Sequence, residues 1–454
     1  MKKENNSAHN HNRGSFSGRI GYVLAVAGSA VGLGNIWRFP YLAAKYGGGI
    51  FLLVYLILAV TFGFSLMITE IAIGRRTGKS VMQAYTKVDK RFKPLGWLAG
   101  AIPVIILPYY CVIGGWVLKY LTAFASGSGH AAAEDGYFAN FISGAGATTL
   151  FFAIFIALTA IVVIFGVQKG IETVSKVMMP VLLALIIGIS IYTLTLPGAL
   201  DGLVYYVRPS LSEFSIKTVI AAMGQLFYSM SLAMGIMITY GSYMRKEDNI
   251  ETSVRQIEVF DTIVAFLAGM IIVPAVFVFS GGDRDALNAG PGLMFVTLPN
   301  VFDSMAGGQI VGVVFFLLVV LAAMTSSISL METVVSMIQD RLGWKRLPSC
   351  LLVVGVSFLL GMLSIFGYSI WSDFTIFKMQ FLDFFDYISN NIMMPIVALM
   401  TCILIGYVAK TTYVEDEISK NTVFRAKGMY RIMIRYICPL CMLLILFSSL
   451  FLTL

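Results

Sequence analysis

The chain has 454 residues, of which 58% are hydrophobic and 12% are charged, and its mean hydropathy is +0.84. Soluble domains carry about twice that share of charged residues, so the composition excludes a soluble protein and places most of the chain in lipid. The net charge of +8 does not indicate nucleic-acid binding, because the basic residues lie in short loops between apolar segments.

The chain opens with a polar stretch, residues 1–16, which we expect to form a cytoplasmic tail. Eleven apolar segments follow, each long enough to cross about 30 Å of hydrocarbon. They lie at residues 18–40, 46–74, 95–125, 148–166, 173–196, 218–243, 257–280, 308–340, 348–368, 380–408 and 430–453. The sequence therefore predicts an all-α integral membrane protein with eleven transmembrane helices.

The loops between these segments alternate in their content of lysine and arginine. Basic residues crowd the loop from Arg75 to Lys93, whereas residues 126–147 carry none and residues 281–307 carry only Arg284. Basic loops stay on the cytoplasmic side of a membrane. We therefore expect the N-terminus in the cytoplasm and, after eleven crossings, the C-terminus outside.

Small, flexible residues interrupt two of the segments. The first interruption, residues 27–35, reads Ala-Gly-Ser-Ala-Val-Gly-Leu-Gly-Asn, and the second, residues 229–235, reads Ser-Met-Ser-Leu-Ala-Met-Gly. Irregular backbone at membrane depth is tolerated only where it is buried in protein or lines a water-filled cavity. One such break in each half of a chain is typical of the midplane binding site of a secondary transporter.

Several charged and hydroxyl residues also lie inside the apolar segments, where a charge without a partner costs several kcal/mol. Asp261 lies early in the seventh segment, and we expect a cation or a cluster of hydrogen-bond donors to face it. Glu70 lies near a segment end, where capping or snorkelling explains a carboxylate as well as a functional role does. In the eighth segment, Thr325-Ser326-Ser327 fits either ordinary small-residue helix packing or a site for a hard cation such as sodium.

The sequence offers little for enzyme chemistry. Its five cysteines all lie in apolar stretches and fit core packing, and its three histidines lie in the polar tail and in a loop. It contains no Gly-x-Ser-x-Gly elbow and no phosphate-binding P-loop. An intramembrane enzyme is therefore disfavoured, and a passive channel or a transport-inactive sensor is a remote alternative to a transporter.

Seven short runs keep their order and spacing within residues 13 to about 410. They are Gly28–Pro40, Gly47-Gly48-Gly49, Pro108-Tyr109-Tyr110, Gln225–Ser229, Ile238–Tyr243, Phe295–Pro299 and Thr325-Ser326-Ser327. Together they resemble the neurotransmitter:sodium symporter family, in its bacterial amino-acid branch. The resemblance covers nearly the whole chain, and it implies a bacterial cell (inner) membrane as the location.

The resemblance implies a leucine-transporter-type fold with broken first and sixth helices. A transporter core at residues 17–410 would consist of two inverted five-helix repeats, at about 17–200 and 215–410. A cytoplasmic loop at 411–427 and an eleventh helix at 428–454 would follow it. Many relatives have twelve spans, and eleven is a known variation in the bacterial branch.

The resemblance also implies two sodium ions as co-transported ligands and no resident cofactor. The first sodium would be bound by Ala30, Asn35, Ser229, Asp261 and the substrate carboxylate. The second would be bound by carbonyl groups of Gly28, Val31 and Ala322 and by the hydroxyl groups of Thr325 and Ser326. Broken helices suit these roles, because they offer free carbonyls to a cation and free N–H groups to an anion.

Chloride-dependent relatives bind chloride near the positions of Tyr55, Gln225, Ser229 and Ala265, and some bacterial relatives have a glutamate at the last of these. Ala265 supplies no charge, but Asp261 lies one helical turn away, where many relatives have asparagine. We therefore expect transport to need sodium but not chloride.

Monoamine-carrying relatives have an aspartate at the position of Gly32, so a glycine there leaves room for a substrate carboxylate and predicts an α-amino acid. Tyr110 is expected to donate its hydroxyl to that carboxylate. The pocket for the substrate side chain is apolar, and flexible Met234 replaces a phenylalanine of a smaller-substrate relative. We therefore expect a large apolar or aromatic substrate such as tryptophan, tyrosine, phenylalanine or leucine. The implied substrate site comprises Ala30, Gly32, Leu33, Gly34, Ile106, Tyr110, Phe227, Tyr228, Ser229, Ser231, Met234, Ser326 and Leu330.

Two charge pairs are implied as gates, Arg38 with Asp386 on the outside and Arg13 with Asp340 on the inside, the second aided by Phe16 and Tyr243. The sequence thus predicts a sodium-coupled symporter that imports a hydrophobic α-amino acid by alternating access. Proton coupling through Asp261 and a broad-specificity hydrophobic carrier remain alternatives. The sequence does not predict an oligomeric state.

Overall fold

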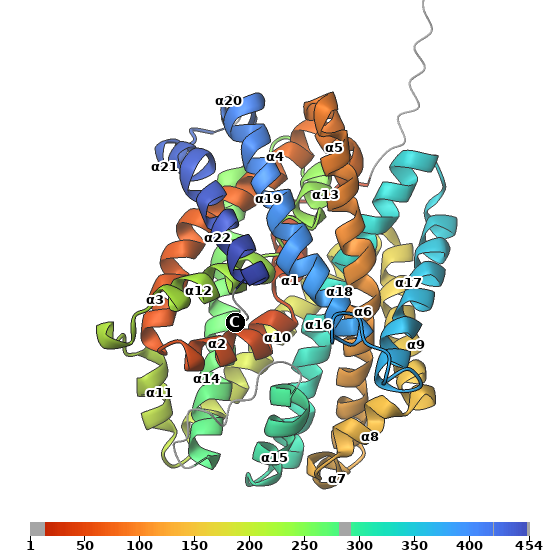
Figure 1. The fold of residues 1–454 in the computed structure, drawn as a ribbon, viewed down its shortest axis with the longest axis vertical. Coiled ribbons are helices and arrows are strands. Elements are labelled where there is room, and N and C mark those ends of the chain that lie inside the picture. The colour runs from red at the N-terminus through yellow and green to blue at the C-terminus, as the bar shows by residue number, and fades with distance from the viewer. Residues whose placement is uncertain (1–13, 281–291, 421, 452–454) are drawn as a thin grey trace, which may run out of the picture.

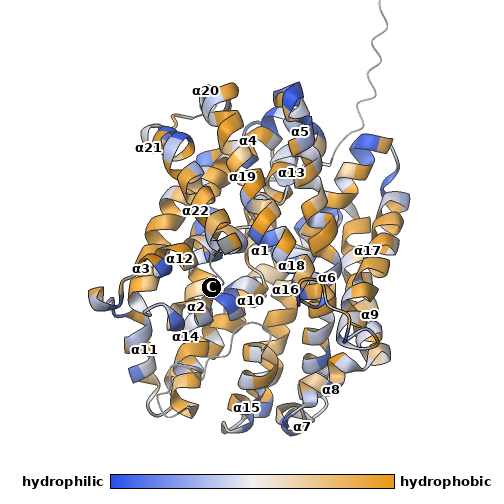
Figure 2. Cartoon of the chain, viewed as in Figure 1, coloured by the Kyte–Doolittle hydropathy of each residue, from blue (hydrophilic) through white to orange (hydrophobic). Residues whose placement is uncertain are grey.

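Most of the described chain is helical, and its long helices run along the long axis of the molecule (Figure 1). The computed structural model describes residues 14–280, 292–420 and 422–451. Most of the predicted tail, including Arg13, and the loop residue Arg284 lie outside the described residues. Hydrophilic residues gather mainly at the two ends of the bundle, and hydrophobic residues cover its middle (Figure 2).

The helices fall into two groups on either side of residue 210. Those before it are α1 (Arg19–Ala30), α2 (Phe39–Lys45), α3 (Gly49–Leu58), α4 (Phe64–Thr77), α5 (Val81–Val88), α6 (Lys93–Ala125), α7 (Gly129–Ala133), α8 (Tyr137–Ser143), α9 (Ala145–Ile164), α10 (Thr173–Leu194) and α11 (Ala199–Val207). Those after it are α12 (Ile216–Ser229), α13 (Ile236–Tyr243), α14 (Ile250–Phe279), α15 (Leu298–Asp303), α16 (Gly308–Leu342), α17 (Arg346–Tyr368), α18 (Phe381–Asp386), α19 (Met394–Ile403), α20 (Thr412–Ile418), α21 (Lys427–Ile432) and α22 (Cys438–Phe451). Short π-helical turns join several neighbours, such as α3 to α4 and α18 to α19.

Within the described ranges, nine helices are long and apolar enough to cross a membrane, when helices joined by a π-helical turn count as one. A tenth crossing results if α1 and the stretch Gly34–Lys45, bent by 57° relative to it, form one broken span. The helices α12 and α13 are both shorter than a span, and residues 230–235 separate them. The structure therefore confirms a helical multi-pass membrane protein, whereas the count of eleven and the inverted repeat stay predictions.

Both breaks have a local cause in the backbone. Helix α1 ends where Val31 adopts an extended conformation (φ −75°, ψ 101°), and a helical turn resumes at Gly34. Between α12 and α13, three residues adopt left-handed backbone conformations: Ser231 (φ 52°), Ala233 (φ 60°) and Gly235 (φ 80°). This conformation costs a residue with a side chain about 1–2 kcal/mol. Contacts around Ser231 and Ala233 must therefore hold them in place.

The broken helices are buried against uninterrupted ones. The longest helices, α6 and α16, have 33 and 35 residues and pack against each other (Figure 1). Helix α1 packs against α10, α14 and α16, and α13 packs against α4. All residues of both breaks are buried. The two breaks therefore meet inside the protein, where α6 and α16 face them.

Candidate functional site

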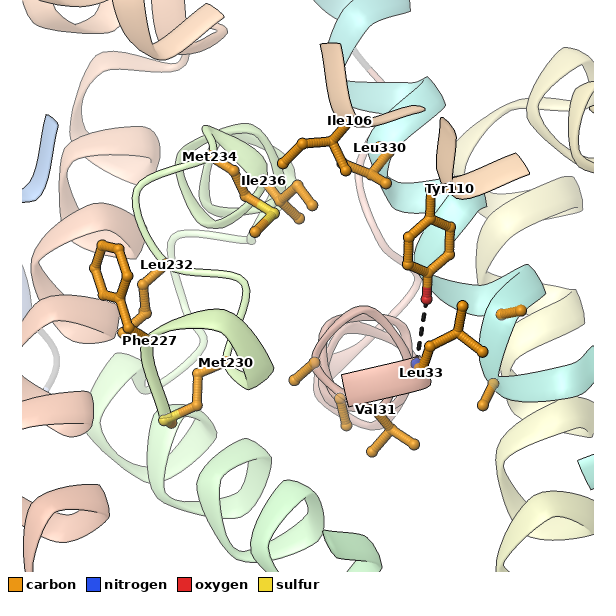
Figure 3. Close-up of a cluster of buried hydrophobic side chains, with 14 of the residues drawn as sticks. Val31, Leu33, Ile106, Tyr110, Phe227, Met230, Leu232, Met234, Ile236 and Leu330 are labelled. Carbon is orange, nitrogen blue, oxygen red and sulfur yellow. Dashed lines mark hydrogen bonds between the residues drawn. The ribbon is translucent and has the colours of Figure 1, made fainter. Parts of the chain in front are cut away.

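The break after α1 presents backbone groups to a tyrosine of α6. The Leu33 N–H donates to the Tyr110 hydroxyl oxygen at 3.3 Å (Figure 3). The Gly32 N–H donates to Asn35 Oδ1 at 3.0 Å, and this closes the turn from which the helix resumes. Tyr110 accepts in its contact with Leu33, so its own hydroxyl proton is available to a further acceptor.

The break between α12 and α13 is held by side chains from other elements. Ser231 Oγ donates to the Ser29 carbonyl at 2.9 Å, which ties this break to the end of α1. The Ala233 N–H donates to Glu70 Oε1 at 2.8 Å, and Glu70 is 2% exposed. A carboxylate of α4 thus satisfies a backbone donor that the interrupted helix leaves free. Glu70 therefore supports the break, rather than snorkelling at a segment end.

Replacing Glu70 with alanine is expected to destabilise the protein, because the buried Ala233 N–H then has no acceptor. Such an orphaned group costs about 1–3 kcal/mol. Glu70→Gln retains a carbonyl oxygen at this position and should keep most of the stability. Thermal unfolding of both variants in detergent checks this, and equal melting temperatures for the two would contradict the assigned role of Glu70.

Asp261 of α14 lies at the centre of a buried polar cluster. Asn35 Nδ2 donates to Asp261 Oδ1 at 2.7 Å, and Ser229 Oγ donates to the same oxygen at 2.9 Å. The Tyr55 hydroxyl donates to Asp261 Oδ2 at 3.3 Å. The four side chains come from α14, from the two breaks and from α3. The expected cluster of donors around Asp261 is therefore present.

Two further predicted residues lie beside this cluster. Gln225 Nε2 donates to the Gly34 carbonyl at 3.0 Å, while its Oε1 has no partner among the described residues. Ala265 is fully buried on α14, one helical turn beyond Asp261. The four residues implied for a chloride site, Tyr55, Gln225, Ser229 and Ala265, carry no carboxylate. Asp261 beside them supplies one.

The hydroxyl groups of α16 face the end of α1. Ser326 Oγ is 3.2 Å from the Ser29 carbonyl oxygen and 3.3 Å from that of Val31. Thr325 Oγ1 donates to the Ala322 carbonyl at 3.0 Å. A Cβ atom added at Gly28 would lie 3.2 Å from Thr325 Cβ, so these two residues are neighbours. The five residues predicted for a second cation therefore come together.

A cavity lies between these two clusters. Phe227 was predicted to line this cavity, but it lines a neighbouring one instead. Ser29 and Ile236 line this cavity although they were not predicted to do so. Figure 3 shows Met234, Ile236, Ile106, Leu330 and Tyr110 arranged around the open space, with Phe227 directed away from them. The full lining is Ser29, Ala30, Gly32, Leu33, Gly34, Asn35, Ile106, Tyr110, Tyr228, Ser229, Ser231, Met234, Ile236, Ser326 and Leu330.

The neighbouring cavity, which we call the vestibule, has a volume of about 710 Å³ and is lined by residues of α2, α6, α12, α18 and α19 among others. Arg38 and Asp386 both line it, but among the described residues they form no ion pair with each other. The Arg38 guanidinium lies 5.4 Å from the centre of the Tyr228 ring, and the Tyr109 hydroxyl donates to Asp386 Oδ1 at 3.1 Å. Tyr228 thus lies between the vestibule and the inner cavity.

Helices α5, α13 and α20 lie at the opposite end of the bundle, which we call the basic end after the loop Arg75–Lys93 (Figure 1). Aromatic side chains pack together at this end. Phe16 is 1% exposed and packs edge-on against Tyr240 and Tyr243. The Ser80 N–H donates to Asp340 Oδ2 at 2.7 Å. The predicted partner of Asp340, Arg13, lies outside the described residues.

A second charge pair at the basic end was not predicted. Arg346 at the start of α17 forms a salt bridge with Glu332 of α16, whose side chain is fully buried. The Tyr243 hydroxyl donates to Glu332 Oε1 at 2.7 Å. Glu332 is recognisable in the sequence as an intramembrane charge, but Arg346 falls between the predicted segments 308–340 and 348–368, where a basic residue gives no comparable signal.

Two broken helices whose free N–H and carbonyl groups surround a buried cavity are the architecture of a secondary transporter. A sequence model of the sodium:neurotransmitter symporter family matches residues 13–129 and 137–453, so the chain belongs to this family. The predicted family is therefore confirmed, and it is a family of transporters.

Individual relatives agree with this assignment. An uncharacterized sodium-dependent transporter of Haemophilus influenzae is 32% identical over 98% of this chain and 100% of its own length. The uncharacterized sodium-dependent transporter YhdH of Bacillus subtilis is 35% identical over 95% of this chain and 96% of its own length. The crystal structure of MhsT in complex with L-phenylalanine matches with a TM-score of 0.86 and 34% identity, covering 96% of this chain and 100% of that one.

Proposed function

We propose that this protein is a sodium-coupled symporter that imports a large hydrophobic α-amino acid and does not require chloride. The observation that carries the proposal is the cluster in which Asn35, Ser229 and Tyr55 converge on Asp261. Family membership supports the dependence on sodium. The basic loops and the bacterial relatives support a bacterial inner membrane, with the basic end in the cytoplasm.

Oxygen atoms that the broken helices bring together support the two proposed sodium sites. The first would use Asp261 and Ser229 with the Ala30 carbonyl and the Asn35 side chain. The second would use Thr325 and Ser326 with the carbonyls of Gly28, Val31 and Ala322. Hard cations such as sodium prefer oxygen ligands of this kind. The Asp261 carboxylate would supply within the protein the negative charge that chloride supplies in dependent relatives.

The amino acid would bind between the two breaks. Its carboxylate would face the N–H groups near Leu33 and Gly34 and accept from the Tyr110 hydroxyl, while its side chain would contact Ile106, Met234 and Ile236. The cavity has a volume of about 30 Å³, so a large side chain requires Met234 to change rotamer, as an unbranched side chain can. A bound L-phenylalanine in the MhsT structure supports this class of substrate.

Gating would use the two ends of the site. Closure of the vestibule would bring Arg38 to Asp386, with Tyr228 beneath them. Opening of the basic end would separate Phe16 from Tyr243 and part Asp340 from Arg13. The salt bridge between buried Glu332 and partly exposed Arg346 would hold the same end closed alongside them.

Proteoliposomes with an imposed inward sodium gradient test the proposal directly. Uptake of tritiated tryptophan, tyrosine, phenylalanine or leucine should exceed the uptake of glycine, aspartate and lysine. It should fall to background when choline replaces sodium and should persist when gluconate replaces chloride. Uptake that persists in choline under a proton gradient would support proton coupling instead. Uptake that equilibrates without accumulation would indicate a channel.

A further inference from the structure

A basic pocket lies at the basic end of the bundle, between α5, the start of α6 and the end of α16. Its volume is about 350 Å³, and the five cations that line it are Lys79, Lys87, Lys90, Lys93 and Arg341. The remaining lining residues are uncharged. The pocket is therefore a concentration of positive charge, and no carboxylate from the described part of the chain lines it.

The nearby acidic side chains have other partners. Asp89 pairs with Arg91 at 2.8 Å, and Asp340 Oδ2 accepts from the Ser80 N–H at 2.7 Å. Among the described residues, none of the five cations of the basic pocket forms an ion pair. Lys87 Nζ donates to the Thr77 carbonyl, so it is held in place but not neutralised. The positive charges of the basic pocket are therefore available to bind an anionic ligand.

An apolar groove continues from the basic pocket along the side of the bundle. It has a volume of about 500 Å³, lies between α6, α16 and α17, and shares Met82, Trp97 and Arg341 with the basic pocket. Its wall includes Leu352 and Val356, each 40% exposed, and Arg341 is the one charged residue among the described residues that line it. Apolar side chains exposed on a membrane-spanning helix face acyl chains.

The junction of the pocket and the groove has the composition of a membrane interface. The Arg341 guanidinium lies 4.5 Å from the Trp97 ring centre, and Trp97 is 45% exposed. Tryptophan is enriched at the level of the lipid headgroups, where its ring is half in lipid and half in water. The boundary between the basic pocket and the apolar groove therefore coincides with the expected depth of a lipid phosphate.

We propose that the basic pocket and the apolar groove together form a binding site for an anionic diacyl phospholipid. The phosphate headgroup would occupy the basic pocket, and an acyl chain would lie in the apolar groove. Basic pockets between transmembrane helices on the cytoplasmic side are suited to anionic lipid headgroups. A free phosphate ion would leave the groove unused, and a zwitterionic lipid would bring no net charge to the five cations of the basic pocket.

This site is separate from the transport site but shares a helix with it. Arg341 lies at the end of α16, the helix that also carries Thr325 and Ser326. Gln83 Nε2 of α5 donates to the Asp340 carbonyl at 2.7 Å, which joins the wall of the basic pocket to the same helix end. Lipid bound to the native protein and not to the unfolded chain is therefore expected to stabilise this end of the bundle.

Native mass spectrometry of the full-length protein in neutral detergent tests the proposal, with phosphatidylglycerol, phosphatidylcholine and inorganic phosphate as probes. We expect retained phosphatidylglycerol adducts and at least about tenfold weaker retention of phosphatidylcholine. The variant Lys79→Gln/Lys90→Gln/Lys93→Gln should lose the phosphatidylglycerol adduct. A control with the same change in charge, Lys169→Gln/Lys217→Gln/Lys378→Gln, should keep it, because these exposed lysines lie outside the basic pocket.

A second variant tests the apolar groove. Val356→Trp fills it without altering charge, so it should weaken phosphatidylglycerol retention while the melting temperature in lipid-free detergent stays near the wild-type value. Equal retention of phosphatidylcholine and phosphatidylglycerol by the wild type would overturn the proposal. So would adducts that survive the triple substitution, or binding of inorganic phosphate that matches phosphatidylglycerol in strength.

Discussion

Replacing Asp261 with asparagine is expected to make transport depend on chloride. The change keeps the size of the side chain and one oxygen, so this oxygen can still accept from Asn35 and Ser229, whereas Tyr55 would have to accept from the new amide instead of donating to it. It removes the negative charge, however, and a hydrogen bond to a charged group contributes about 1.5–3 kcal/mol. Loss of this contribution corresponds to a fall of about 10- to 100-fold in sodium-driven uptake without chloride.

Chloride should restore part of this loss if an anion binds near Tyr55, Gln225 and Ser229, as the family resemblance implies, and replaces the missing charge. Uptake by the Asp261→Asn variant would be measured with a fixed sodium gradient in chloride and in gluconate. Asp303→Asn is the matched control, since Asp303 lies on α15 and pairs with His130 at 2.9 Å, away from the cluster. Unchanged uptake by Asp261→Asn in gluconate would exclude Asp261 as the balancing charge.

The sequence could predict those parts of the site that use an unusual residue at an unusual depth. Asp261 stands out because a carboxylate inside an apolar segment demands partners, and the structure provides three of them. The breaks after Ala30 and Ser229 stand out for the same reason, since runs of small residues interrupt long apolar segments. The family followed from these runs together, and the sequence comparisons confirm it.

Other features of the site depend on residues that are neighbours only in three dimensions, and no pattern in the sequence indicates them. Ser231 and Ala233 adopt left-handed conformations although neither is a glycine. The conformation of Ala233 is supported by the hydrogen bond from its N–H to Glu70, more than 160 residues away in the sequence. Ile236 lines the cavity because Gly235, the N-cap of α13, turns the chain just before it. Phe227 and Tyr228 are neighbours in sequence, yet only Tyr228 reaches the inner cavity.

Substituting Gly32 is expected to block substrate binding with little effect on folding. A Cβ atom added there would lie 2.7 Å from Ser326 Oγ and 2.9 Å from the Tyr110 hydroxyl. Both distances are shorter than real contacts, so Ser326 and Tyr110 must move. Ser326 would then lose its contacts with the carbonyls of Ser29 and Val31, and the space for a substrate carboxylate would be filled. We expect Gly32→Ala to lower sodium-driven uptake by at least about tenfold, equivalent to about 1.4 kcal/mol of binding free energy.

The position of Gly32 also allows a test of what the site recognises. Gly32→Asp places a carboxylate where the substrate carboxylate would bind, so this variant should lose amino-acid binding while a decarboxylated analogue such as tyramine should gain affinity relative to tyrosine. Gly224→Ala is the matched control, since a Cβ at Gly224 of α12 meets no atom within 4 Å. Binding is measured by scintillation proximity with each ligand in sodium and in choline. If Gly32→Ala and Gly224→Ala bind the amino acid equally well, the substrate carboxylate does not lie beside Gly32, and the orientation of the substrate between the two breaks is wrong.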